Sequence, residues 1–255
     1  MSSSIWTRCA GDSELRPLRL TAWRVVEAQH EVSTRKLVQS AAEQELLETL
    51  LERVKPPALD GPQLHYLLFT PFRYPPLRHG SRFGTRQERG IWYGSEQQRT
   101  AFAEVAYYRL LFLEGTQAAL APLHTALTSF TVRLRSERGI DLTRPPFAAH
   151  EPDLASPQSY HASQPLGRAM RDAEVALFRF RSARDAEGGT NVGAFSAAVF
   201  HRATPQHLER WHATATRDAV DFVRGDARRP RTMYLFPRGQ FLVEGVLPVL
   251  PVVSG

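Results

Sequence analysis

A glutamate within an otherwise apolar segment is the clearest candidate for chemistry in this sequence. Residues 101–113 contain only two charged side chains, Glu104 and Arg109. A segment that is apolar nearly all round is expected to form a buried helix, and an ionised carboxylate on it needs a partner or a cavity. Glu104 and Arg109 are five positions apart and therefore lie on different faces. Two interpretations stay open for Glu104: a structural ion pair with another arginine, or a functional carboxylate in a cleft.

Basic and aromatic residues gather in the stretch that precedes this helix. A loop over residues 75–90 is rich in proline, glycine and arginine, a composition typical of long polar loops that carry function. An aromatic triplet precedes the loop, and a second apolar triplet follows it. The side chains of interest in this stretch are Arg73, Tyr74, Arg78, Arg82, Arg86, Arg89 and Tyr93.

The elements that must position these residues can be predicted from hydrophobic periodicity. Residues 33–54 carry apolar side chains at three- and four-residue steps, which predicts an amphipathic helix that ends before Pro56 and Pro57. We therefore interpret residues 1–60 as an N-terminal helical extension and 61–255 as the main domain. Within 1–60, residues 23–26 are compatible with a short strand or an extended segment against the main body.

The main domain is predicted to contain several short strands and few helices. Residues 65–70 and 91–93 are predicted strands, and a capping box at Ser95 and Gln98 predicts the start of a helix that ends at Gly115. Further strands are expected at 129–135, 176–181, 192–200, 232–236 and 240–246, with a short helix from Pro165. This pattern indicates an α+β fold with a mostly antiparallel sheet and flanking helices.

Composition excludes several classes of protein. The chain has 255 residues, 42% of them hydrophobic and 23% charged, which is typical of a folded globular protein. No apolar run approaches the length of a membrane span and no signal peptide is recognised, so we expect a cytoplasmic protein without membrane contact. The single cysteine, Cys9, excludes an internal disulfide and a cysteine-ligated metal cluster. The nine histidines have no zinc-type spacing, so no metal is expected.

The formal net charge of +6 comes almost entirely from arginine, because only Lys36 and Lys55 are lysines. The basic residues are spread along the chain, with the densest runs at 73–89 and 224–238. Such a diffuse surplus favours anionic small molecules, or no particular partner, over a nucleic-acid groove. Nucleophile-elbow, phosphate-loop and dinucleotide-turn motifs are absent from the sequence.

The order and spacing of the motifs in residues 72–104 resemble the RES domain family, bacterial toxins named for arginine, glutamate and serine. The stretches that carry the resemblance are Phe72-Arg73-Tyr74, Gly80-Ser81-Arg82-Phe83-Gly84, Ile91-Trp92-Tyr93 and Ala101-Phe102-Ala103-Glu104-Val105, with Glu104 eleven positions after Tyr93. Ser81, Phe83 and Gly84 depart from the family pattern. The family serine would fall at Ser196.

The resemblance implies an ADP-ribosyltransferase-like fold that takes NAD as its substrate and breaks the nicotinamide–ribose bond. It implies that Glu104 stabilises the ribose cation, that Arg73 and Arg82 hold the pyrophosphate, and that Tyr93 and Tyr74 pack against nicotinamide or its ribose. Ser196 would orient Glu104 or the nicotinamide end. The acceptor stays open between water, phosphate and a protein, which correspond to an NAD glycohydrolase, an NAD phosphorylase and an ADP-ribosyltransferase.

The resemblance also implies a helical DNA-binding antitoxin that blocks the active site, as in toxin–antitoxin systems. Assembly into an oligomer is left open. Two alternatives compete with the enzyme interpretation: a non-enzymatic protein that holds nucleic acid or another polyanion through residues 224–238, and a catalytically silent member of the family.

Overall fold

A single mixed sheet forms the centre of the protein in a computed structural model that describes residues 4–28, 43, 64–74, 76, 79–116, 120–225 and 232–249. The strand order is β1-β2-β5-β4-β3-β6-β7-β8. The strands are β1 (Arg16–Glu27), β2 (Trp92–Ser95), β3 (Leu123–Asp141), β4 (Leu177–Arg181), β5 (Thr190–Ala194), β6 (Gln206–Ala215), β7 (Ala219–Arg224) and β8 (Met233–Pro237). The helix expected at 33–54 lies outside the described residues.

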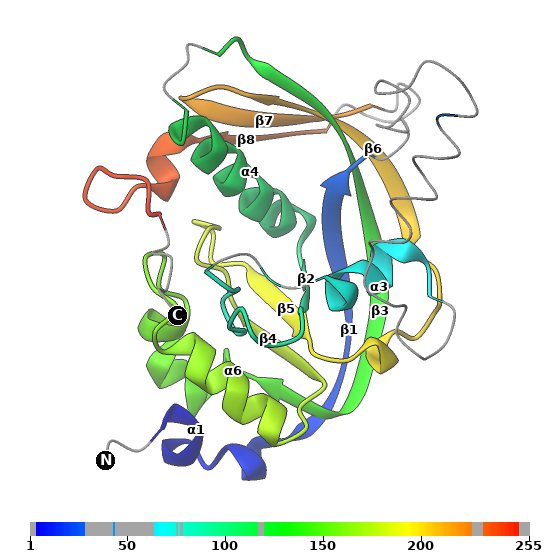
Figure 1. The fold of residues 1–255 in the computed structure, drawn as a ribbon, viewed down its shortest axis with the longest axis vertical. Helices are drawn as coiled ribbons and strands as arrows, with labels where there is room; N and C mark the ends of the chain where they lie inside the picture. The colour runs from blue at the N-terminus through cyan, green and yellow to red at the C-terminus, as the bar shows by residue number, and fades with distance from the viewer. Residues whose placement is uncertain are drawn as a thin grey trace.

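The long pair β1 and β3 organises the sheet (Figure 1). The two strands run antiparallel from Arg16 opposite Gly139 to Glu27 opposite Leu127. β1 also meets β2 at Trp23 opposite Ser95, so the hydrogen-bonded strands β1, β2, β5, β4 and β3 close on themselves. Only the contact between β3 and β4 is parallel among the strand pairs of the described residues. The α+β class with a mostly antiparallel sheet is confirmed.

Residues 16–27 are therefore part of the sheet itself, where the sequence suggested only a short strand or extended segment within an N-terminal extension. Apolar residues at every second position place Leu18, Leu20 and Ala22 of β1 against the core formed with β3 and β5. A strand paired along its whole length contributes backbone hydrogen bonds to the sheet that no external segment would provide. The structure thus brings the beginning of the chain into the main domain.

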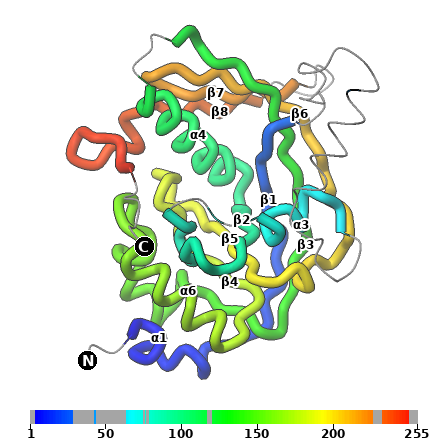
Figure 2. Tube along the Cα trace, in the orientation of Figure 1, coloured from blue at the N-terminus to red at the C-terminus, as the bar shows by residue number. Residues whose placement is uncertain are grey.

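Two groups of helices cover the two ends of the sheet, and α3 (Tyr66–Arg73) lies apart from both groups, in contact with β2, as Figure 2 shows. The helix α4 (Gln98–Glu114) packs against the β6–β8 end, where Phe102, Trp211 and Phe222 are fully buried. At the other end α1 (Ile5–Arg8), α5 (Glu151–Leu154) and α6 (Ser163–Asp172) surround a second core with Phe178 at its centre. The 3-10 segments are Gly11–Glu14, Phe147–His150, Ala197–Val199 and Arg238–Phe241. Residues from β1, β2 and most of the length of α4 line a cavity in the protein.

Several local predictions are wrong. Residues 65–70 form most of a helix, α3 (Tyr66–Arg73), because the His65 side chain accepts from the Leu67 amide as its cap and Leu68 and Phe72 share one buried face. A short apolar run cannot be assigned to strand or helix by periodicity alone. The strand predicted at 240–246 does not form: the segment begins inside the 3-10 turn Arg238–Phe241, and Val243 and Val246 make only an isolated bridge. The cap of α4 is Gln97, with no side-chain cap bond, so the capping box at Ser95 is also wrong.

Candidate functional site

A cavity of about 940 Å³ opens between β1, β2, α4 and the loops that follow α3 and β4. This volume lies near the upper end of the range for small-molecule sites, roughly 300–1,000 Å³. Its walls combine apolar side chains such as Tyr74, Tyr108 and Phe112 with the charged residues Glu104 and Arg184. The cavity is therefore large enough for a dinucleotide and carries charges of both signs.

Glu104 lies in the wall of this cavity and is held by two neutral donors. Ser182 Oγ donates to Glu104 Oε1 at 2.8 Å, and Asn191 Nδ2 donates to the same oxygen at 2.5 Å. Within the described residues no hydrogen bond or ion pair reaches Oε2 of Glu104. The carboxylate is thus fixed through one oxygen, and its second oxygen is left for a ligand in the cavity. The ion pair with an arginine, one of the two sequence-based interpretations, does not form in the described structure.

The two donors are themselves oriented by other groups. Ser95 Oγ donates to Asn191 Oδ1 at 2.6 Å, which turns the amide nitrogen of Asn191 toward Glu104. Ser182 Oγ accepts from the backbone amides of Arg184 and Asp185, each at 3.1 Å. Because a hydroxyl has only one proton to donate, these two incoming bonds direct that proton to Glu104.

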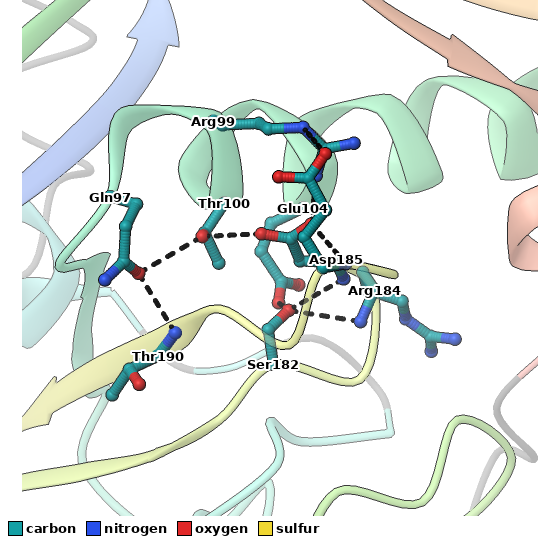
Figure 3. Close-up of polar contacts among 9 residues, drawn as sticks. Gln97, Arg99, Thr100, Glu104, Ser182, Arg184, Asp185 and Thr190 are labelled. Atoms are coloured by element: carbon teal, nitrogen blue, oxygen red, sulfur yellow. Dashed lines mark hydrogen bonds and ion pairs between the residues drawn. The ribbon is translucent and has the colours of Figure 1, made fainter.

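A second polar cluster fixes the loop after β4 to the first turn of α4 (Figure 3). Asp185 forms an ion pair with Arg99 and accepts a hydrogen bond from Thr100 Oγ1 at 2.7 Å. Gln97 Oε1 accepts from the Thr190 amide at 3.1 Å on the far side of the same loop. The loop that carries Ser182 is therefore attached to the beginning of α4 at two points, Asp185 and Thr190.

Tyr93, on β2, lines the cavity, and its hydroxyl group is bonded to the turn at residues 81–84. Its Oη lies 3.0 Å from Ser81 Oγ and accepts from the Phe83 amide at 3.2 Å. Burial raises the pKa of the phenol well above its usual value, and the hydrogen bonds from Ser81 and Phe83 oppose that shift. Tyr93 therefore stays protonated and ties the glycine-flanked turn at 81–84 to the sheet.

Arg82 projects from that turn and is buried beside the cavity. Its Nη1 donates to the Leu154 and Ser156 carbonyls at 3.0 and 2.9 Å, and its guanidinium lies 5.0 Å from the centre of the Tyr160 ring. Gly80, with a φ of +73°, permits the turn that directs Arg82 inward. Arg82 is therefore one of the residues that line the cavity.

Arg24 is a further cationic residue of the cavity, and the sequence reasoning missed it. It lies on β1, donates from Nη1 to the Tyr93 carbonyl at 3.1 Å, and lines the cavity. Burial lowers the pKa of its guanidinium to about 10, which still leaves it charged at neutral pH. Arg24 is the only charged residue in the otherwise apolar stretch 23–26. A lone charge in an apolar segment is the same signal that indicated Glu104, and it could have identified Arg24.

The other expected site residues lie in different places. Tyr74 lines the cavity, but Arg73, the last residue of α3, does not. Ser196 does not reach Glu104: it caps the 3-10 turn at 197–199 by accepting from the Ala198 amide. The serine that contacts Glu104 is Ser182, directly after the alternating strand β4. A polar residue at the end of a buried strand is a signal that could have pointed to it.

Metal sites and membrane-spanning helices were also sought among the residues that the structure describes. Within it, no group of three or more histidine, cysteine, aspartate or glutamate side chains is arranged to hold a metal ion. None of the helices among these residues is long and apolar enough to cross a membrane.

Comparison with known proteins gives a family match and a likeness to solved structures. The family model described as RES domain matches residues 50–217. No curated protein matches the chain at a significant level. A chain of the crystallised M. tuberculosis MbcT–MbcA toxin–antitoxin complex is similar over 83% of this chain and 91% of that one, with 14% identity and a TM-score of 0.46. The family match covers residues that include Tyr93, Glu104, Ser182 and Asn191.

Proposed function

The chain belongs to the RES domain family, and on this basis we propose that it is a toxin that binds NAD and breaks the bond between nicotinamide and ribose. The observation that carries the proposal is Glu104: its carboxylate is held through one oxygen by Ser182 and Asn191, with the other oxygen open to a cavity of about 940 Å³. A preorganised anion of this kind stabilises positive charge that develops in a transition state.

The reaction needs little more than this carboxylate. As the bond between ribose C1′ and the pyridinium nitrogen breaks, its electron pair goes to nitrogen, and nicotinamide leaves as a neutral molecule. The positive charge passes to C1′ and the ring oxygen of the ribose, where Glu104 faces it. Because the leaving group is already cationic, no general acid is required. Water, phosphate or a protein side chain then forms the new bond to C1′.

The rest of the cavity supports a dinucleotide substrate. Arg24 and Arg82 place positive charge along the walls, and Tyr74 and Tyr108 provide aromatic surface for a ring. Tyr93 contributes its ring to the wall, since its hydroxyl is bound to Ser81 and Phe83. Ser182 and Asn191 act as positioning residues for Glu104. Following the family, the proposal includes an antitoxin partner that covers the cavity.

The test is release of nicotinamide from NAD by the purified protein in water, with added phosphate, and with cell extract. We expect release by the parent and a loss of at least ~100-fold in Glu104→Gln, the scale for removing a group that stabilises transition-state charge. Glu137→Gln is the matched control, because Glu137 is an exposed carboxylate on β3. Phosphate dependence would identify a phosphorylase, and label on a protein would identify a transferase.

Absence of release in all three conditions would contradict the proposal. The polyanion-binding and silent-homologue alternatives would then be separated by salt dependence, because binding to a polyanion weakens steeply between low and moderate salt.

A further inference from the structure

Arg184 is a buried cation in the cavity wall whose hydrogen-bonding capacity is only partly used. It is 4% exposed, and its Nη2 donates to the Pro157 carbonyl at 2.9 Å. Its guanidinium stacks on the Tyr107 ring, 3.5 Å from the ring centre. Among the residues that line the cavity, it alone carries a buried side-chain nitrogen or oxygen, Nη1, without a hydrogen-bond partner in the described structure.

This arrangement leaves positive charge without a matching anion. Within the described residues neither Arg184 nor the nearby buried Arg82 has a carboxylate within ion-pair distance; both are held by carbonyl oxygens of the segment 154–157. A buried charge without a counter-ion is costly. A buried guanidinium in a cavity wall, with one nitrogen left without a hydrogen-bond partner, is suited to an anionic oxygen, above all to phosphate.

The place of Arg184 relative to Glu104 indicates which anion fits. Arg184 stacks on Tyr107, which is three residues after Glu104 on α4. Side chains three positions apart on a helix are neighbours, roughly 5–6 Å apart at Cβ. Figure 3 shows the Arg184 side chain extending away from Ser182, and Arg184 and Glu104 line the same cavity. A ligand with its ribose C1′ at Glu104 and a phosphate a few bonds away meets both groups.

We propose that Arg184 binds the phosphate attached to the 5′ oxygen of the nicotinamide ribose and so sets the preference of the cavity for a nucleotide over a nucleoside. This inference rests on the proposed function, because it takes the ribose that Glu104 faces as its reference point. It assigns Arg184 to substrate binding, and it explains why a buried arginine is held by carbonyls and a ring with one nitrogen left unbonded.

The experiment compares two ligands that differ only in this phosphate. In Glu104→Gln protein, which does not turn over, calorimetry measures the dissociation constants of nicotinamide mononucleotide and nicotinamide riboside. We expect the mononucleotide to bind at least ~10-fold more tightly, the scale of a hydrogen bond to a charged group. In Glu104→Gln/Arg184→Gln we expect that ratio to fall to about 1, while riboside binding persists and shows that the cavity is intact.

Two further variants complete the test. Arg184→Lys keeps the charge without the planar fork and should restore part of the ratio. Arg135→Gln removes an exposed arginine of β3 outside the cavity and should leave the ratio unchanged. The proposal would be overturned if the ratio of riboside to mononucleotide dissociation constants were the same in Arg184→Gln as in Arg135→Gln. It would also be overturned if, in Glu104→Gln protein, the mononucleotide bound no more tightly than the riboside or did not bind.

Inorganic phosphate separates the two sources of such an anion. Competition of phosphate with the mononucleotide, lost in Arg184→Gln, supports the substrate-phosphate site. If phosphate instead accelerates nicotinamide release by the parent through Arg184, and the ligand ratio does not depend on Arg184, the site belongs to a free phosphate acceptor and the assignment is overturned. If the parent releases no nicotinamide yet the ratio depends on Arg184, the anion site stands and only the proposed reaction fails.

Discussion

Asp185 lies in the loop after β4, and Glu104 is hydrogen-bonded to the same loop through Ser182. The two carboxylates differ in how many of their oxygens are bonded within the protein. Asp185 has a side chain that is 3% exposed, forms an ion pair with Arg99, and accepts hydrogen bonds from Thr100 Oγ1 and the Glu187 amide. Among the described residues, Glu104 receives only the neutral donors Ser182 and Asn191, both on one oxygen, and it lines the cavity. Both carboxylate oxygens of Asp185 have partners within the protein. In the described structure only Oε1 of Glu104 has hydrogen-bond partners.

This difference separates a carboxylate that holds the fold from one that is kept for a ligand. A fully paired buried charge gains nothing from a substrate, because its oxygens are already bonded. A carboxylate that is anchored through one oxygen is oriented without being neutralised. Ser182 connects the two, since its Oγ accepts from the Asp185 amide and donates to Glu104. The Asp185 cluster thus supports the geometry of Glu104 without entering the reaction.

The largest effect should come from breaking the paired carboxylate. Asp185→Asn removes the charge partner of Arg99 and weakens the acceptor for Thr100. Because Arg99 is 25% exposed and keeps its contact to Glu187, we expect a loss of about 2 kcal/mol in the free energy of unfolding, below the 3–5 kcal/mol of a fully buried pair. Urea denaturation measures it.

The control for this variant is Glu187→Gln, which removes the exposed partner of Arg99 and should cost less than ~0.5 kcal/mol. Nicotinamide release by Asp185→Asn at a temperature where it is folded should change far less than in Glu104→Gln. A loss of activity as large as that of Glu104→Gln, with unchanged stability, would show that Asp185 takes part in the reaction.

The next effect tests which serine belongs to the site. Ser182→Ala removes a donor to Glu104 and the acceptor of two loop amides, so we expect kcat to fall by ~10-fold, about 1.4 kcal/mol, with a smaller change in KM. Ser196→Ala removes only a 3-10 cap and should leave kcat within a factor of ~2. Steady-state nicotinamide release decides between them, and equal kcat values for the two variants would contradict the assignment of Ser182.

The fold class could be predicted from the sequence because hydrophobic alternation is local. Residues 129–135 and 176–181 alternate clearly, and both lie within strands. The role of residues 16–27 could not be predicted, since pairing with β3 joins residues that are a hundred or more positions apart. β6 and β7 were missed because polar residues occupy much of β6 before the alternation that begins at Trp211.

The candidate site was predictable only where a motif is contiguous. Glu104, Tyr93 and Arg82 lie close in sequence, and the structure places all three at one cavity. Ser182 and Asn191, which contact Glu104, lie far along the chain from it: Ser182 directly follows β4, and Asn191 is on β5. No spacing rule relates residues that are so far apart in sequence. The sequence therefore pointed to Ser196, whereas the serine that contacts Glu104 in the structure is Ser182.

The smallest effect concerns Tyr93, whose hydroxyl, like Asp185, is bonded within the protein. Burial raises the pKa of this phenol, so in the unfolded chain, where its pKa is about 10, the proton leaves first. Above pH ~10 the unfolded state therefore binds fewer protons, and stability falls as pH rises. Burial also raises the pKa of Tyr107 and Tyr108, which adds to this loss.

Tyr93→Phe should accordingly cost about 1 kcal/mol at pH 7, through the lost bonds to Ser81 and Phe83. That difference from the parent should shrink as the pH rises above ~10, because the variant no longer has this phenol to keep protonated. Urea denaturation at pH 7, 9 and 10.5 measures it, with Tyr66→Phe, an exposed tyrosine of α3, as the matched control. A difference that stays constant over this range would mean that the Tyr93 hydroxyl is open to solvent, and Tyr93 would then join Glu104 as a group available to a ligand.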